Sequence, residues 1–303
     1  MNQQLFDGLC QVAGREQVLV KEPMNRHTTF RIGGPADFFV VPETPEKLAA
    51  VVDYCRKQQV PFYILGNGSN LLVGDKGYRG VIIQVYKNMN EVQVIGEEIH
   101  ARAGAMLSVI AKQALANSLT GFEFASGIPG TLGGAVMMNA GAYGGEMKDI
   151  VKEVTVLTTD GEMVTIPGNE MEFGYRTSVV EKKAYIVLGA VLKLEQGDQE
   201  AIRQRMEELK EQRTSKQPLD LPSAGSTFKR PEGYFAGKLI MDAGLRGFSV
   251  GGAQVSEKHC GFVVNKGGAT AADVRELMKQ VNEKVQSQFG VPLEPEVKML
   301  GEF

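Results

Sequence analysis

The sequence predicts an α+β protein built from two or three lobes, and three observations support this fold class. The first is length, because 303 residues exceed the usual size of one domain and can bury a sizeable core. The second is patterning, since segments with a helical apolar period are interspersed with short strands and hairpins. The third is composition: hydrophobic residues make up 43% and charged residues 23%, as in ordinary globular proteins.

The first eighty-odd residues have the pattern of a small lobe in which strands surround one helix. Thr44 is a suitable N-cap and Pro45 suits the first helical position, so a helix is expected to begin here. Its buried face is expected to comprise Leu48, Val51, Val52 and Cys55. Strands are predicted at residues 36–41, 60–65, 71–73 and 80–85.

Hairpins dominate the middle of the chain, and helices dominate its last third. Hairpins are predicted from 91–95 with 98–103, and from 151–159 with 162–166 around Asp160-Gly161. A further strand is expected at 185–194, and two short ones in the last third. Helices are predicted at 106–117, 199–212, 234–243 and 271–289. The extended segment 293–297 must pack on another part of the chain to be ordered.

Charge and hydropathy exclude several classes of protein. The formal net charge is −3 and the isoelectric point is near 5.8, whereas a general nucleic-acid binder presents a basic face. Residues 1–10 lack the basic start and the apolar run of a signal peptide. A membrane span needs about 18 consecutive apolar residues, and no stretch of the sequence is that long. We expect a cytoplasmic monomer with no nucleic-acid or membrane partner.

Cysteine and histidine are sparse. Cys10, Cys55 and Cys260 form no CxxC pair, which indicates inert free thiols in a reducing compartment. The three histidines form no zinc motif, so no metal site is expected, and the elbow motif of serine hydrolases does not occur. These absences favour chemistry carried out on a bound cofactor.

Two glycine-rich segments are candidates for contact with a flat or phosphorylated ligand. The loop 66–70 follows a predicted strand but lacks the features of a Walker loop and of the dinucleotide fingerprint, so an anion site and a plain tight turn are equally consistent with it. The longer run 127–145 allows either close approach of a ligand or close packing of a helix on a sheet. Ligand contact is favoured, because a buried loop of this length is otherwise unusual.

Charged residues supply a third candidate site, at residues 223–231. Ser226, Lys229 and Arg230 bring hydroxyl and cationic groups into one loop, which suits a diphosphate through charge-assisted hydrogen bonds. An ordinary solvated loop fits the same composition equally well. Arg176 and Glu296 are isolated charged residues, and composition alone favours surface ion pairs over catalytic residues at both positions.

Short motifs spread over nearly the whole chain resemble those of the UDP-N-acetylenolpyruvoylglucosamine reductases, and they occur in the family's order. They are Thr-Thr-Phe-Arg-Ile-Gly-Gly at 28–34, Leu-Gly-Asn-Gly-Ser-Asn-Leu-Leu at 65–72, Gly-Ile-Pro-Gly at 127–130, Met-Asn-Ala-Gly-Ala-Tyr-Gly at 138–144, Tyr-Arg-Thr-Ser at 175–178, Pro222 to Lys229, Gly-Ala-Gln-Val-Ser at 252–256 and Leu-Glu-Pro-Glu-Val at 293–297. Only eight residues separate Arg176 from Tyr185, which resembles the family's shorter type without an extra tyrosine-bearing loop.

The resemblance implies an α+β architecture: the FAD-binding fold of the p-cresol methylhydroxylase and vanillyl-alcohol oxidase type, in two α+β lobes, followed by a C-terminal α+β substrate lobe. The expected first FAD-binding lobe is 1–85, with the tail 297–303 packing back on it. The second FAD-binding lobe is expected at 86–198 and the substrate lobe at 199–296.

The resemblance also implies roles for individual residues. Arg176, Ser226 and Glu296 match the family's catalytic residues. Substrate contacts are expected from Lys229, Arg230 and His259, although the family has asparagine at the position of Arg230. The residues expected to hold the FAD pyrophosphate and ring system are Gly66, Asn67, Gly68, Ser69, Asn70, Gly127, Ile128, Pro129, Gly130, Gly133, Gly134, Asn139, Ala140 and Gly141.

The implied activity is that of an NADPH-dependent flavoprotein oxidoreductase of peptidoglycan synthesis, and hence of cell wall biogenesis, cell shape and cell division. FAD would be bound non-covalently, since neither glycine segment contains histidine or cysteine, and NADPH would be the co-substrate. A hydride would reach the methylene carbon of UDP-N-acetylglucosamine enolpyruvate, and Ser226 would protonate the alpha carbon to give UDP-N-acetylmuramate. Two alternatives are an FAD-dependent sugar or alcohol oxidase of the same fold and a non-catalytic nucleotide-sugar binding module.

Overall fold

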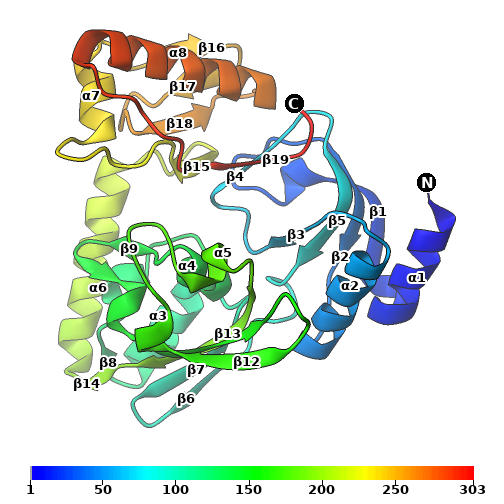
Figure 1. The fold of residues 1–303 in the computed structure, drawn as a ribbon. Coiled ribbons are helices and arrows are strands. Elements are labelled where there is room, and N and C mark those ends of the chain that lie inside the picture. Colours follow the sequence, from blue (N-terminus) through cyan, green and yellow to red (C-terminus); the bar gives the residue numbers. More distant parts are fainter. Residues whose placement is uncertain (1) are drawn as a thin grey trace. The chain divides into compact units, whose positions relative to one another are not determined.

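The computed structural model describes residues 2–303, and the chain divides into two compact units (Figure 1). Unit 1 comprises the chain up to Leu19, Phe39–Asn67 and Val81–Arg213, and unit 2 comprises Val20–Phe38, Gly68–Gly80 and Thr214–Phe303. The three-lobe division expected from the sequence stays a prediction. Within the described part of the chain, no helix is long and apolar enough to cross a lipid bilayer.

Capping side chains set the ends of the principal helices. In α2 (Pro45–Lys57), the Thr44 side chain accepts a hydrogen bond from Lys47 N at 3.2 Å, which confirms the predicted N-cap. In α8 (Ala271–Phe289), Thr270 and Asp273 form a capping box, and Gly290 ends the helix with a φ of 71°. The other helices are α1 (Gln3–Ala13), α3 (Leu107–Ala116), α4 (Leu132–Met137), α5 (Val179–Lys182), α6 (Gln199–Lys216) and α7 (Ala236–Asp242).

Unit 1 is built around an antiparallel sheet in the order β12-β11-β13-β7-β6. Helix α3 packs on β6 and β7 of this sheet, and α4 packs on β7 and β13 (Figure 1). The predicted hairpin at Asp160-Gly161 joins β11 to β12, with Gly161 at a φ of 87°. The strands are β6 (Val92–Ile95), β7 (Glu98–Arg102), β11 (Val151–Leu157), β12 (Met163–Pro167) and β13 (Ile186–Lys193).

A second sheet has the order β1-β2-β5-β3, and β3 and β5 are parallel. Its strands are β1 (Val18–Pro23), β2 (Pro35–Val40), β3 (Phe62–Leu65) and β5 (Tyr78–Gln84). The sequence predicted β2, β3 and β5, whereas α1 and β1 were missed. Two short pairs complete this description: β8 (Leu119–Thr120) with β14 (Glu195–Gln196), and β9 (Gly141–Ala142) with β10 (Gly145–Glu146).

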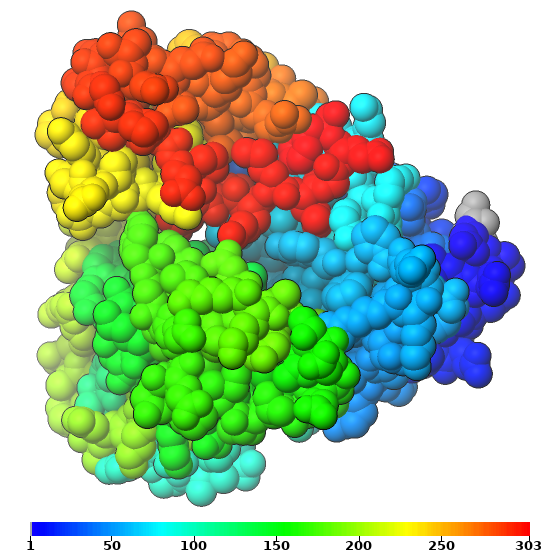
Figure 2. Space-filling model, in the orientation of Figure 1, coloured from blue at the N-terminus to red at the C-terminus, as the bar shows by residue number. Residues whose placement is uncertain are grey.

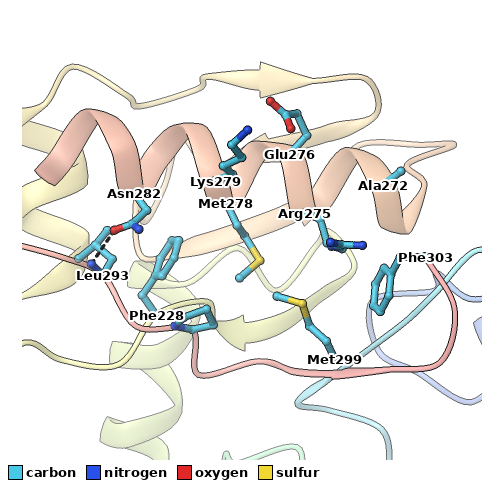
Figure 3. A pocket seen from close by; sticks show the side chains of 11 residues that line it. Phe228, Ala272, Arg275, Glu276, Met278, Lys279, Asn282, Leu293, Met299 and Phe303 are labelled. Carbon is cyan, nitrogen blue, oxygen red and sulfur yellow. Dashed lines mark hydrogen bonds between the residues drawn. The ribbon is translucent and has the colours of Figure 1, made fainter. Parts of the chain in front are cut away.

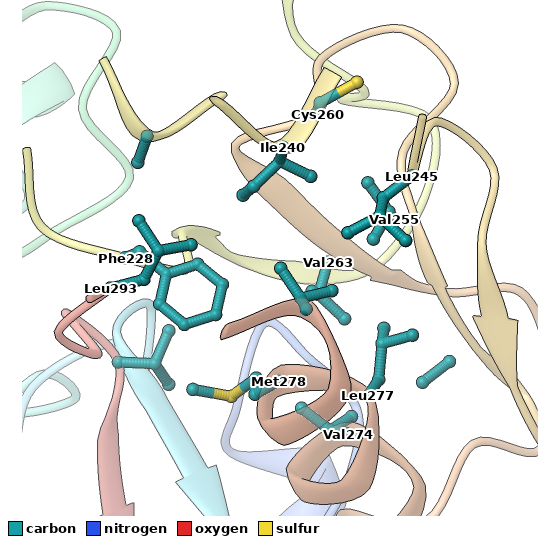
Figure 4. Packing of buried hydrophobic residues seen from close by; sticks show 14 of the residues in the cluster. Phe228, Ile240, Leu245, Val255, Cys260, Val263, Val274, Leu277, Met278 and Leu293 are labelled. Carbon is teal, nitrogen blue, oxygen red and sulfur yellow. The ribbon is translucent and has the colours of Figure 1, made fainter. Parts of the chain in front are cut away.

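Unit 2 places α7 and α8 against a sheet in the order β15-β18-β17-β16. The strands are β15 (Ser223–Ser226), β16 (Ser249–Val250), β17 (Ala253–Val255) and β18 (Phe262–Asn265). Figure 4 shows Ile240 of α7, Leu277 of α8 and Val263 of β18 meeting in the core of this unit. Burial of such side chains is the main source of stability for a unit of this kind.

The C-terminal tail packs within unit 2. Strand β19 (Lys298–Leu300) pairs in parallel with β4 (Leu71–Val73). In Figure 2 the red tail accordingly lies beside the cyan segment that contains β4. This pairing orders the segment that follows Glu296, a residue of the candidate site.

The loop after β4 also caps α8, and this contact yields a stability prediction. The Asp75 carboxylate accepts hydrogen bonds from Ala271 N at 2.7 Å and Ala272 N at 2.9 Å. A carboxylate at a helix N-terminus stabilises it by about 1 kcal/mol. Asp75→Asn should therefore raise the hydrogen-exchange rate of the first-turn amides of α8 about fivefold. Asp53→Asn, which removes only an exposed ion pair with Lys57, should leave these amides unchanged.

Candidate active site

In unit 1, the start of the first glycine loop meets the start of the second glycine-rich run. The Asn67 side-chain amide donates a hydrogen bond to the Pro129 carbonyl at 2.7 Å. A Cβ built on Gly66 would come closer to Thr131 Oγ1 than non-bonded atoms can approach. The two segments thus come together at Gly66, Asn67 and residues 129–131, while Gly68, Ser69 and Asn70 belong to unit 2.

The glycines of the second run serve two purposes. Gly133 lies against Ala103, since a Cβ there would be 3.1 Å from Ala103 Cβ, and its amide donates to Ala103 O at 2.8 Å. Close packing of α4 on the neighbouring chain therefore explains this glycine. Gly134 differs, because the nearest atom to its Cβ would be Thr131 Oγ1 at 3.8 Å. The backbone at Gly134 is thus open to close approach by a ligand.

A cation that sequence reasoning missed lies beside this run. Arg213, near the end of α6, is placed with its Cδ 3.1 Å from the position of a Cβ on Gly127. Burial lowers the pKa of the Arg213 guanidinium, and Tyr143 opposes this effect; arginine stays charged even so. A half-buried cation next to glycine-rich backbone fits the pyrophosphate of a dinucleotide. The sequence pattern of α6, an ordinary charged amphipathic helix, gave no signal for this contact.

The Gly66–Thr131 contact yields a prediction for cofactor binding. In Gly66→Ala, the added methyl group must displace Thr131, and overpacking of this kind costs about 1–3 kcal/mol. We expect this variant to retain less FAD after gel filtration, because the two glycine segments can no longer approach each other. Adding Thr131→Ala removes Oγ1 and leaves 3.5 Å to the residue-131 Cβ, so the double variant should recover FAD binding. Failure of that recovery would contradict the packing explanation.

Arg176 lies at the corner of a tight turn in unit 1. Gly174 and Thr177 exchange main-chain hydrogen bonds at 3.1 and 3.4 Å, and Arg176 adopts a φ of 56°. A non-glycine residue in this conformation is strained and is retained only when its surroundings hold it. Ser178, which follows this turn, is buried, and its hydroxyl donates a hydrogen bond to Met137 O at 2.8 Å. Helix α5 fills the short connection between Arg176 and Tyr185.

Ser226 ends strand β15 at an irregularity in its pairing with β18. Ser223 is opposite Val264 and Ser226 is opposite Phe262, with a register shift between them. Gly225 takes a φ of 76° within this shift. Bulges of this kind reorient the side chain that follows, and Ser226 is exposed. The sequence placed this segment in a loop, because a bulged four-residue strand lacks the alternating apolar pattern.

The segment that contains Glu296 runs beside the Ser226 segment in unit 2. Glu296 N donates to Thr227 O at 2.9 Å, and Lys229 N donates to Glu294 O at 2.8 Å. The Asn70 side-chain amide donates to Glu296 O at 3.2 Å. These bonds hold the main chain of Glu296 next to that of Ser226 in a fixed register.

The predicted substrate-binding residues follow Ser226 in unit 2. The Lys229 ammonium pairs with the Glu294 carboxylate, and the Arg230 guanidinium lies 4.0 Å from the centroid of the Phe235 ring. Burial lowers the pKa of His259, which favours its neutral form. Since its Nδ1 accepts a hydrogen bond from Gly261 N at 3.1 Å, the ring proton is on Nε2, where it can donate to an anionic oxygen.

A groove of about 510 Å³ lies between α8 and the C-terminal tail. Figure 3 shows Met278 of α8 and Met299 of the tail facing each other across it. Phe228 and Pro295 line it, each close in sequence to a candidate catalytic residue. Among the described residues that line this groove, none belongs to the predicted catalytic set, so we do not assign it to the chemistry. Residues 2–303 also contain no cluster of three or more His, Cys, Asp or Glu side chains arranged to hold a metal ion.

Two family models match separate parts of the chain. Residues 36–167 match an FAD binding domain, and residues 217–300 match the C-terminal domain of UDP-N-acetylenolpyruvoylglucosamine reductase. An alkyldihydroxyacetonephosphate synthase structure aligns with 65% of this chain and 41% of its own, at a TM-score of 0.51 and 16% identity; this likeness shows the fold alone. Together these matches confirm the FAD-binding fold expected from the sequence.

Whole-chain comparisons show the family. The UDP-N-acetylenolpyruvoylglucosamine reductase of Agathobacter rectalis is 54% identical over 100% of both chains. The crystal structure of the corresponding Thermus caldophilus reductase aligns with a TM-score of 0.80 and 37% identity, covering 93% of this chain and 98% of the other. The chain therefore belongs to the UDP-N-acetylenolpyruvoylglucosamine reductases, a family of flavoprotein oxidoreductases.

Proposed function

We propose that this protein reduces UDP-N-acetylglucosamine enolpyruvate to UDP-N-acetylmuramate for peptidoglycan synthesis, using NADPH and non-covalently bound FAD. The observation that supports this activity most strongly is the fixed pairing of the Ser226 and Glu296 segments in unit 2, through the Glu296 N to Thr227 O hydrogen bond of 2.9 Å. That pairing occurs in a chain that also matches an FAD binding domain.

The glycine segments and Arg213 would hold the cofactor. Asn67 and residues 127–134 would surround the pyrophosphate, with the open backbone at Gly134 allowing close approach and Arg213 supplying positive charge. When bound, FAD accepts hydride from NADPH and supplies it to the second substrate. Absence of histidine and cysteine from residues 66–70 and 127–145 favours a non-covalent complex.

The protein's task in reduction is to stabilise charge on the substrate. An enol ether is electron-rich, so hydride addition at its methylene carbon is favourable only if negative charge on the alpha carbon and carboxylate is stabilised. Arg176 would pair with the carboxylate through its planar guanidinium, and Glu296 would orient the same group by a hydrogen bond. Preorganised electrostatic contacts of this kind usually provide the largest part of catalysis.

Proton delivery completes the reaction. Ser226 Oγ would donate its proton to the alpha carbon, which forms the C–H bond and leaves the serine oxygen to be reprotonated from solvent. Lys229, three residues along the chain, is the basic group that would assist this return through water. The diphosphate of the nucleotide would contact Lys229, Arg230 and His259. At Lys229 it would replace the Glu294 carboxylate as the partner of the ammonium group.

Anaerobic flavin spectroscopy separates this function from its two alternatives. The purified protein should be yellow, lose its colour with NADPH and regain it rapidly with the enolpyruvyl nucleotide. Rapid reoxidation by oxygen alone would indicate an oxidase of the same fold. Protein that stays colourless after addition of FAD would indicate a nucleotide-sugar binding module.

A further inference from the structure

Asn139 has every polar position of its side chain engaged within unit 1. Its Nδ2 donates to Glu146 Oε2 at 2.9 Å and to Gly174 O at 3.1 Å. Its Oδ1 accepts from Lys148 N at 2.9 Å. The residue is 2% exposed, and the loss of such buried bonds is costly.

One of these contacts reaches the turn that presents Arg176. Gly174 O accepts the turn-closing bond from Thr177 N at 3.4 Å and the stronger bond from Asn139. Since the turn-closing bond is long, the Asn139 amide is the main restraint on this carbonyl. The turn between Gly174 and Thr177 holds Arg176 at its strained φ of 56°. Such a conformation needs support from its surroundings.

A second contact controls the charge near Arg176. Glu146 has its pKa lowered chiefly by a hydrogen bond from Lys148, then by one from Asn139, with Arg176 contributing through its charge. Asn139 therefore helps Lys148 to orient the Glu146 carboxylate. The same amide group thus contacts both the turn that carries Arg176 and the Glu146 carboxylate, which also pairs with Lys148 Nζ at 2.8 Å.

Asn139 is itself held in a restricted conformation. Its φ is 44°, which asparagine, aspartate and glycine tolerate better than other residues. Because its main-chain amide donates to Val136 O at 3.3 Å, the residue is anchored at the end of α4. The Arg176 turn is thereby fixed to the second glycine-rich run and not only to its sequence neighbours.

We propose that Asn139 is a positioning residue that holds Arg176 in place to bind the substrate carboxylate. This inference rests on the proposed role of Arg176 in carboxylate recognition. The Asn139 side chain would contribute to the site through its hydrogen bonds to Glu146, Lys148 and Gly174. A misplacement of about 1 Å in a catalytic contact reduces a rate by about 10², so a measurable effect is expected.

Asn139→Asp removes the two donated hydrogen bonds and places a negative charge beside Glu146. Aspartate has the same shape, tolerates the same φ and keeps an oxygen for Lys148 N, but its carboxylate cannot donate to Gly174 O or Glu146. Titration calorimetry should compare binding of UDP-N-acetylmuramate, which has the lactyl carboxylate, with UDP-N-acetylglucosamine, which lacks it. We expect the first affinity to fall about tenfold, as for a carboxylate contact weakened by about 1.4 kcal/mol, and the second to stay within about twofold.

Asn88→Asp is the matched control. Its side-chain amide also donates to a carbonyl and to a side-chain oxygen, Val41 O at 3.2 Å and Gln17 Oε1 at 3.3 Å. The substitution is chemically identical but removes contacts of a different loop of unit 1. Both nucleotide affinities should be unchanged in this variant. If Asn139→Asp retains no flavin, Asn139→Gly replaces it, since glycine tolerates the φ and removes both donors without adding charge.

A double-variant cycle distinguishes positioning from general structural damage. If Asn139 acts through Arg176, Asn139→Asp should weaken UDP-N-acetylmuramate binding much less when Arg176 is already lysine. Additive losses, or equal losses for both nucleotides, would overturn the inference. If Arg176→Lys alone does not discriminate between the nucleotides, the proposed role of Arg176 fails instead. If Arg176→Lys discriminates and the Asn139 variant does not, only the positioning role is wrong.

Discussion

Ser226→Ala is expected to leave flavin reduction by NADPH near the wild-type rate and to slow reoxidation by the enolpyruvyl nucleotide by roughly 10²–10⁴-fold, the usual effect of losing a general acid. The reason is chemical selectivity. Removal of Oγ takes away the proposed proton donor to the alpha carbon, while the glycine segments that would hold FAD lie in other parts of the chain. Single-turnover stopped-flow at saturating nucleotide measures the two half-reactions separately.

The competing explanation is that Ser226 binds phosphate or stabilises the bulge in β15. That role predicts weaker nucleotide binding with a near-normal limiting rate of reoxidation, and such a result would remove Ser226 from the mechanism. Ser223→Ala is the matched control, because it deletes a hydroxyl from the same strand, opposite Val264. We expect both half-reactions of this control to match the wild type.

Arg176→Lys is expected to slow reoxidation by the nucleotide by about 10²-fold, comparable to the loss of one preorganised contact to a developing anion. Lysine keeps the positive charge but lacks the planar fork that matches a carboxylate in two-point contact. Reduction by NADPH should change far less. The same stopped-flow experiment gives both rates.

A second arginine provides the control for this substitution. Arg56 in unit 1 donates to Thr158 O at 3.3 Å and lies 5.9 Å from the centroid of the Phe62 ring. Arg56→Lys should leave both half-reactions unchanged, because this residue lies outside the candidate site. Equal losses in both half-reactions of Arg176→Lys would indicate that Arg176 supports FAD binding or folding instead.

The helices could be predicted from the sequence wherever a local cap coincided with regular apolar spacing. The predicted boundaries of α8 are confirmed, and so is the buried face of α2, because the capping residues Thr44, Thr270 and Gly290 are adjacent to their own helices in the sequence. Helix α3, predicted at 106–117, spans Leu107–Ala116 and buries residues at helical spacing, namely Leu107, Ile110, Ala111 and Ala114. Helix α1 was not predicted from the sequence, although the Asn2 side chain caps it.

The candidate site was harder to predict, because it depends on contacts distant in sequence. Residue types and the family's motif order pointed to Ser226 and Glu296, but the bond between Thr227 and Glu296 that holds their segments together joins residues far apart in the chain. The bulge at Gly225 depends on pairing with β18 and leaves no local pattern. The network around Asn139 and the position of Arg213 beside Gly127 likewise follow from tertiary packing. The roles of all these residues in catalysis and binding stay predictions.

The position of isotope in the product tests the central claim most directly. NADPH that carries deuterium at its transferable position should be used with the enolpyruvyl nucleotide in ordinary water, and the product examined by proton and carbon NMR. The proposed reaction predicts one deuterium in the lactyl methyl group and none at the alpha carbon, with the reverse pattern when unlabelled NADPH is used in deuterium oxide. Deuterium from NADPH at the alpha carbon would contradict hydride addition to the methylene carbon.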